Sequence, residues 1–134
     1  MSLDIHERDR EGIAILDLDG RLTVGNEMAT YREAMKTLID AGKRSIILNM
    51  AKVDYVDSTG LGALVMSYTT LHKAGGQVRL LNLTRRSIEL LVMTKLTTIF
   101  EVFDDEQNAV NSFFPDREIK HFDILSFVQH MKEE

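Results

Sequence analysis

Residues 57–62 (Asp-Ser-Thr-Gly-Leu-Gly) hold the side chains best suited to chemistry in this chain. They follow an apolar stretch at 45–50, and they precede apolar residues that recur at the i, i+3, i+4, i+7 spacing of a helix face in 61–72. This pattern predicts a helix whose first turn carries the hydroxyls of Ser58 and Thr59. Because the first N–H groups of a helix lack partners and the helix dipole is positive there, a phosphate at this turn would be tolerated.

Two interpretations of these residues remain open. Asp, Ser and Thr are ordinary N-cap residues, each worth about 1 kcal/mol, so the segment could simply begin a helix. It could also present a phosphate acceptor, with Gly60 and Gly62 leaving the backbone uncovered for a partner. The carboxylates of Asp54 and Asp57 are interpreted as loop or capping groups rather than as a general acid and base.

The sequence does not favour an enzyme. Ser58 lacks the Gly-x-Ser-x-Gly nucleophile elbow, and the chain contains neither a phosphate-binding Gly-x-x-x-x-Gly-Lys-[Ser/Thr] loop nor a His pair with zinc-like spacing. His72, on or beside the apolar stripe, is expected at the edge of the core. With no cysteines there is no thiol nucleophile. We therefore expect no catalysis, no metal and no cofactor.

Residues 46–83 resemble the STAS domain family, which includes the bacterial anti-sigma-factor antagonists. The resemblance lies in the strand, the Asp-Ser-[Ser/Thr]-Gly-Leu-Gly turn, the helix after it, and Gly75-Gly76 before the apolar strand 78–83. A weaker similarity extends from about residue 3 to about residue 114. The resemblance implies a protein that binds an anti-sigma factor, itself a serine kinase, and so frees a sigma factor for transcription. Phosphorylation of the motif serine would end that binding, and a serine phosphatase would restore it.

The resemblance also assigns roles to individual residues. Ser58 matches the phosphorylated serine of the family, and Thr59 occupies an adjacent position that some STAS scaffold proteins use instead. The family often has an acidic residue where this chain has Thr23, so Thr23 or Asn26 could instead cap the next helix or bond a partner. The expected partner-binding residues are Asp57, Ser58, Thr59, Gly60, Leu61, Thr23 and Asn26.

The periodicities predict an α/β fold with a mixed sheet of four to five strands covered by helices. The resemblance implies that this sheet is STAS-like. Thr84 is expected to be the N-cap of a short helix, and Asp104 with Gln107 resembles a capping box. The order is an N-terminal hairpin, a helix and then a βαβ unit. The expected strands are 3–8, 13–18, 45–50, 77–83 and 99–103, with a loop at 19–26 and a helix at 59–73.

The resemblance predicts a STAS domain at 1–115, followed by a C-terminal helical extension at 116–134. Ile124, Phe127, Val128 and Met131 follow helical spacing in the extension. An exposed apolar face of this kind is unfavourable in water. We therefore expect the extension to pack on its own domain or on a partner subunit, which would make a homodimer possible.

The amino-acid composition limits the kinds of partner that this chain is expected to bind. The formal net charge of −5 comes with no clustered basic face, so direct nucleic-acid binding is not expected. No apolar run approaches the roughly 18 residues of a membrane span. The first residues lack the features of a signal peptide, which fits a cytoplasmic protein.

Two rival functions are considered. One is an unphosphorylated STAS scaffold or a transport-associated STAS domain, whose turn is never modified. The other is a phosphoryl-accepting receiver or a hydrolase. A receiver needs acidic residues at strand ends and a Lys after the last strand, whereas this chain has Asp17 and Asp19 in its second strand but Asp104-Asp105 after the last.

Overall fold

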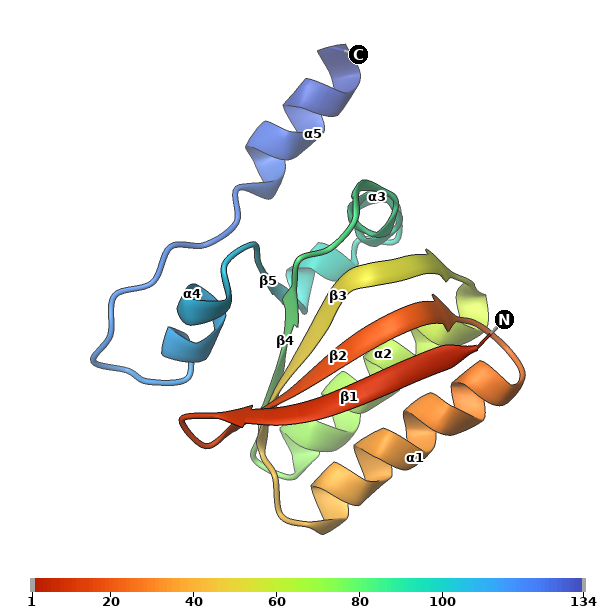
Figure 1. The fold of residues 1–134 in the computed structure, drawn as a ribbon. Coiled ribbons are helices and arrows are strands. Elements are labelled where there is room, and N and C mark those ends of the chain that lie inside the picture. The colour runs from red at the N-terminus through yellow and green to blue at the C-terminus, as the bar shows by residue number, and fades with distance from the viewer. Residues whose placement is uncertain (1, 134) are drawn as a thin grey trace.

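The chain forms one mixed sheet with helices on both faces. The computed structural model describes residues 2–133, and the side chains of residues 2–130. The strand order is β1-β2-β3-β4-β5; β1 is antiparallel to β2, and every later pair is parallel (Figure 1). The predicted hairpin, the βαβ unit and the α/β class are confirmed.

The strands nearest the N-terminus are longer than predicted. β1 (Leu3–Arg10) and β2 (Ile13–Leu22) are joined by a two-residue turn, and β3 (Ser45–Val56) follows α1. The loop predicted at 19–26 is wrong as far as Leu22, because β2 stays paired with β3 up to the Leu22↔Val56 pair. The register of this pairing shifts between Asp17 and Asp19 and again between Gly20 and Arg21. Such irregularities accommodate a polar segment that lacks the alternating pattern of a regular strand.

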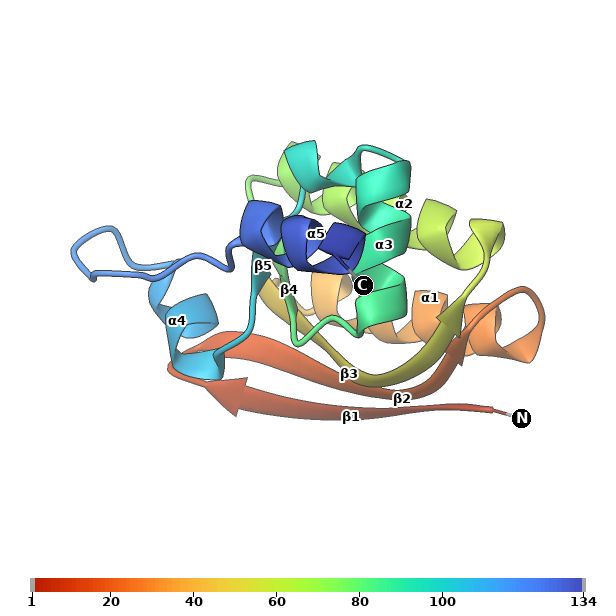
Figure 2. The same ribbon diagram turned by 90° about the horizontal axis from the view of Figure 1, so that it is seen from above.

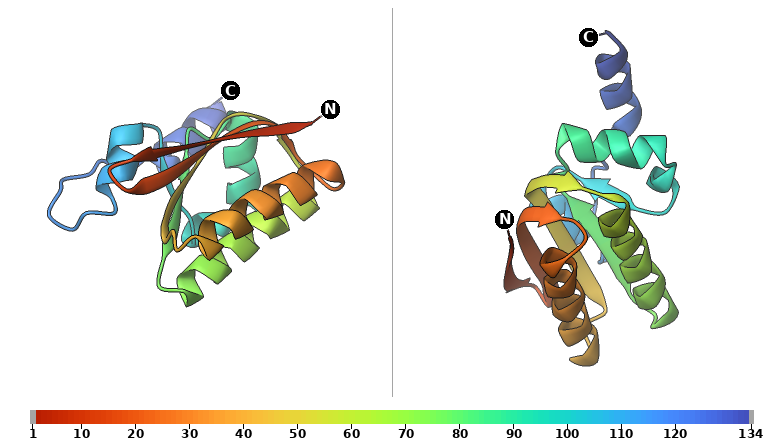
Figure 3. Two further views of the ribbon diagram at one scale, coloured as in Figure 1. Left: turned by 60° about the horizontal axis from the view of Figure 1, so that its bottom comes forward. Right: turned by 90° about the vertical axis from the view of Figure 1, so that its right-hand side faces the viewer.

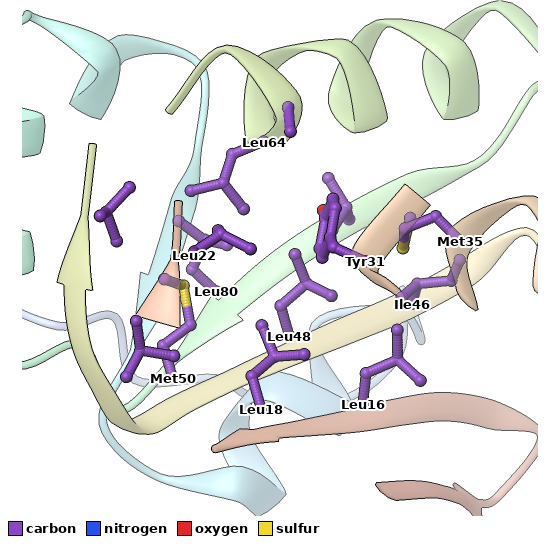
Figure 4. Close-up of a cluster of buried hydrophobic side chains, with 14 of the residues drawn as sticks. Leu16, Leu18, Leu22, Tyr31, Met35, Ile46, Leu48, Met50, Leu64 and Leu80 are labelled. Carbon is purple, nitrogen blue, oxygen red and sulfur yellow. The ribbon is translucent and has the colours of Figure 1, made fainter. Parts of the chain in front are cut away.

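Three helices cover one face of the sheet. α1 (Asn26–Asp40) and α2 (Ser58–Lys73) lie side by side, and α3 (Arg85–Met93) follows β4 (Gln77–Leu81) (Figures 2 and 3). As predicted, Thr84 caps α3 by accepting a hydrogen bond from Ser87 N–H. Figure 4 shows the core between α1, α2 and the sheet, where the labelled residues are Leu16, Leu18, Leu22, Tyr31, Met35, Ile46, Leu48, Met50, Leu64 and Leu80.

The opposite face is covered by α4 (Glu106–Asn111). It follows η1 (Leu96–Thr98) and β5 (Glu101–Phe103), and its Ala109 and Val110 are fully buried. The predicted Asp104–Gln107 capping box is wrong: Asp105 is the N-cap and accepts from Asn108 N–H. The last strand is shorter than 99–103 because the N–H groups of residues 99 and 100 bond back to the first residue of η1.

The C-terminal extension is anchored at its start. α5 (Ile124–Glu133) projects away from the sheet (Figure 1). Phe122 and Ile124 pack against the main core, whereas Leu125 is 78% exposed. The side chain of Met131 lies outside the described residues, and the division of the chain at 115 remains a prediction. Within residues 2–133, neither α5 nor any other helix is long and apolar enough to cross a membrane.

Candidate functional site

The predicted phosphate-acceptor turn lies where β3 ends and α2 begins. Asp57 is the N-cap, and its Oδ1 accepts a hydrogen bond from Gly60 N–H at 2.8 Å. The helix therefore starts at Ser58, one residue earlier than predicted. Ser58 is exposed and Thr59 is half-buried. Among the described residues the Ser58 hydroxyl makes no side-chain hydrogen bond, so it stands free at the surface.

Asp57 also holds the neighbouring loop. Its Oδ2 accepts a hydrogen bond from Val24 N–H at 3.0 Å, and its own N–H donates to the Leu22 carbonyl at 3.3 Å. Hydrogen bonds from the N–H groups of Gly60 and then Val24 lower the pKa of Asp57. The Asp57 carboxylate therefore places a negative charge beside Ser58. Its two hydrogen bonds also connect the β2–α1 loop to the start of α2.

The two glycines of the motif have different roles. Gly60 is buried, and a β-carbon there would lie 1.9 Å from the Leu22 carbonyl oxygen. The interpretation that Gly60 leaves the backbone uncovered for a partner is therefore wrong, because the protein's own β2 occupies that space. Gly62 is exposed, and a β-carbon there would have no heavy atom within 4 Å. Of the two, Gly62 alone keeps the surface open.

The other expected partner residues divide between surface and core. The N-cap of α1 is Gly25, with φ +111° and no side-chain cap, so the suggestion that Thr23 or Asn26 caps α1 is wrong. Thr23 is half-buried and Asn26 is exposed; both flank the loop that Asp57 holds. Leu61 is half-buried and packs against the core. The surface of the turn is therefore formed by Ser58 with the β2–α1 loop.

Large apolar side chains stand exposed on these same elements, and the sequence analysis missed them. Val24 is 67% exposed on the β2–α1 loop, and Met66 is 64% exposed on α2. Ser58, Gly62 and Met66 are spaced four residues apart, which places them on one helix face. This spacing, on the side away from the buried stripe, is the sequence signal that could have identified Met66.

The histidine and acidic candidates of the sequence analysis lie on several different elements of the described chain. Within residues 2–133 no cluster of three His, Asp or Glu side chains could hold a metal ion. His72 is exposed and stacks on Tyr68 at 5.6 Å, which corrects its expected place at the edge of the core. Asp54 lies on β3 rather than in a loop. Asp17, considered above for a receiver, accepts hydrogen bonds from Arg8 at 2.7 Å and Asn49 at 2.8 Å.

Comparison with known proteins places these features in context. The family model described as "STAS domain" matches residues 4–109. The chain is 30% identical over 121 residues to the anti-sigma-B factor antagonist of Listeria monocytogenes, covering 84% of this chain and 98% of that protein.

Two solved structures show the same fold. An anti-sigma factor antagonist from Mycobacterium paratuberculosis superposes with a TM-score of 0.74 at 15% identity, covering 82% of this chain and 92% of the other. The Bacillus cell fate determinant SpoIIAA, in its phosphorylated form, superposes with a TM-score of 0.64 at 20% identity, covering 83% and 98%.

Proposed function

Because this chain belongs to the STAS domain family, we propose that it is an anti-sigma-factor antagonist switched by phosphorylation of Ser58. Unphosphorylated, it binds an anti-sigma factor that is also a serine kinase, and a sigma factor is thereby released. The kinase transfers the γ-phosphoryl group of its bound ATP to the Ser58 hydroxyl, which ends the complex. A serine phosphatase removes the phosphate and resets the switch. The chain itself performs no catalysis.

The single observation that carries this proposal is the exposed Ser58 hydroxyl at the first position of α2. A kinase supplies the catalytic groups, so its substrate needs only an accessible hydroxyl in fixed geometry. The Asp57 cap supplies that fixed geometry through its hydrogen bonds to Gly60 and Val24. The acceptor is therefore held rigidly without being covered.

Electrostatics explains how the phosphate would act. A phosphoserine adds about −1.5 to −2 charge units. The N-terminus of α2 favours this charge, whereas the neighbouring Asp57 carboxylate repels it. The domain keeps its fold, but a partner packed on this turn then faces an unpaired charge. A loss of about 3 kcal/mol in binding would lower affinity roughly a hundredfold.

Incubation with purified anti-sigma kinases and ATP, followed by mass spectrometry, tests the assignment. We expect one phosphate, at Ser58. Ser58→Ala should abolish labelling and still bind the kinase, whereas Ser58→Asp should bind more weakly.

Thr59→Ala is the matched control, since it removes the neighbouring hydroxyl and leaves Ser58 in place. Labelling of Thr59 in the parent protein would contradict the assignment to Ser58. Binding without labelling would favour an unphosphorylated STAS scaffold. If both Ser58 variants bound like the parent, the switch would be refuted.

A further inference from the structure

A groove of about 430 Å³ runs between α1 and α2, on the side of these helices that the sheet does not cover. The two helices lie side by side over the sheet in both views of Figure 3. Apolar and small side chains form most of its lining. The lining includes Tyr31, Met35, Ile39, Gly62, Met66 and Thr70.

The floor of the groove offers no free polar group. The buried Tyr31 hydroxyl and Ser67 Oγ lie 2.8 Å apart and share a hydrogen bond. Ser67 Oγ in turn donates to the Ala63 carbonyl at 2.9 Å. Among the described residues no buried side-chain polar atom lacks a partner. An occupant would therefore gain free energy from apolar contact and not from new hydrogen bonds to the floor.

The groove begins on the same helix as the predicted phosphate-acceptor turn. Gly62 lines it and lies four residues beyond Ser58, and Met66 follows four residues later. Four helical residues rise by about 6 Å, so the near end of the groove is about one turn from the Ser58 hydroxyl. Gly62 carries no side chain between them, and a β-carbon there would have no heavy atom within 4 Å. One partner could therefore cover both.

The rim on α1 differs in charge from the rest of the protein. Arg32 and Lys36 line it with Asp40, a balance of +1 in a chain whose formal charge is −5. Lys36 pairs with Asp40 at 2.5 Å, and Arg32 forms no ion pair among the described residues. An exposed guanidinium beside an apolar groove favours an occupant that carries a carboxylate next to an apolar group.

We propose that this groove is a second docking surface for the same anti-sigma kinase, a proposal that rests on the function inferred above. It receives an apolar side chain of the kinase, with an adjacent carboxylate paired to Arg32. Binding in the groove fixes the position of the kinase along α2. Ser58 is thereby placed in the active site of the kinase. Met66, at the open edge of the groove, provides the largest exposed apolar contact.

The test measures affinity for each purified anti-sigma kinase of the source organism. Met66→Asp and Arg32→Glu should each weaken binding at least tenfold. The matched controls are Met93→Asp, a methionine 80% exposed on α3, and Lys52→Glu on β3, and both should remain within about twofold of the parent. Because these side chains are exposed, we expect every variant to fold, and circular dichroism checks that each one does.

The outcomes separate this proposal from the proposed function. If the parent binds no kinase and acquires no phosphate, the proposed function fails. If the parent binds and is phosphorylated at Ser58, but Met66→Asp and Arg32→Glu behave like their controls, the groove proposal alone fails. If these variants instead change the sedimentation of the protein by itself, the groove belongs to a second copy of the chain and the proposal is also overturned.

Discussion

The α-carbon of Gly60 lies so close to the Leu22 carbonyl oxygen that a β-carbon at residue 60 would stand 1.9 Å from it. The first turn of α2 is thus seated against the end of β2, and the neighbouring Ser58 is exposed. The same contact brings the β2–α1 loop within reach of the Asp57 carboxylate. The position of the candidate phosphate acceptor therefore depends on a glycine that faces inward.

Replacement of the two motif glycines should have opposite effects. In Gly60→Ala the new methyl group clashes with backbone that cannot easily move, and we expect a loss of about 1–3 kcal/mol or more in the free energy of unfolding. Gly62→Ala is the matched control, because it adds a methyl group in open space inside a helix and should stabilise by about 0.5–1 kcal/mol. Urea denaturation followed by circular dichroism measures both. Equal stability of the two variants would contradict the packing described here.

Loss of the Asp57 carboxylate should loosen two elements at once. Asp57→Ala removes the N-cap of α2 and the acceptor for Val24 N–H, at a cost of about 1 kcal/mol. Amide hydrogen exchange should therefore accelerate at both Gly60 and Val24. Asp54→Ala is the control, since this exposed carboxylate lies three residues earlier and caps no helix. Faster exchange at Gly60 alone would show that the Val24 contact does not hold the loop.

Stability should fall in acid through the ion pairs that join the hairpin to α4. Arg8 contacts both Asp17 and Glu106, and the Arg8 guanidinium lowers the pKa of Glu106 below its ordinary value of 4.5. A carboxylate with a lowered pKa in the folded protein stabilises the fold above that ordinary value, and the contribution is lost as the pH falls through the folded pKa. Because these side chains are partly exposed, we expect about 1 kcal/mol or less.

Urea denaturation at several pH values measures this contribution. Glu106→Gln should reduce the slope of stability against pH below 4.5, whereas Glu89→Gln, in an exposed pair on α3, should change it little. An unchanged slope in Glu106→Gln would assign the acid sensitivity to other groups.

The start of the C-terminal extension should contribute to stability, and its exposed apolar side chain should not. Phe122 is half-buried against the core, so Phe122→Ala should cost about 1–2 kcal/mol, less than for a fully buried ring. Leu125→Ala serves as the control because Leu125 is 78% exposed. Thermal unfolding compares the two. A larger loss in Leu125→Ala would indicate that α5 is covered by a second subunit in solution.

Local sequence patterns were sufficient to predict those features, such as a helix or a helix cap, that depend on neighbouring residues. The helical spacing after residue 58 predicted α2, and Thr84 was correctly identified as a cap because capping depends on the following three residues. The capping box at Asp104 was wrong, since two adjacent aspartates satisfy nearly the same local rule and only the direction of the chain after β5 selects Asp105.

The sequence by itself determined the α/β class and a hydroxyl at the start of a helix, because periodicity and capping are properties of adjacent residues. It also indicated the family, through the resemblance of residues 46–83 to the STAS motif. Only the tertiary structure decided that Gly60 faces inward while Gly62 stays open, since that depends on where the end of β2 lies. It also decided that Asp57 accepts a hydrogen bond from Val24, in a loop 33 residues earlier, and that a groove between α1 and α2 begins at Gly62. Contacts between residues distant in the chain depend on how the sheet and helices pack, and no local pattern records them.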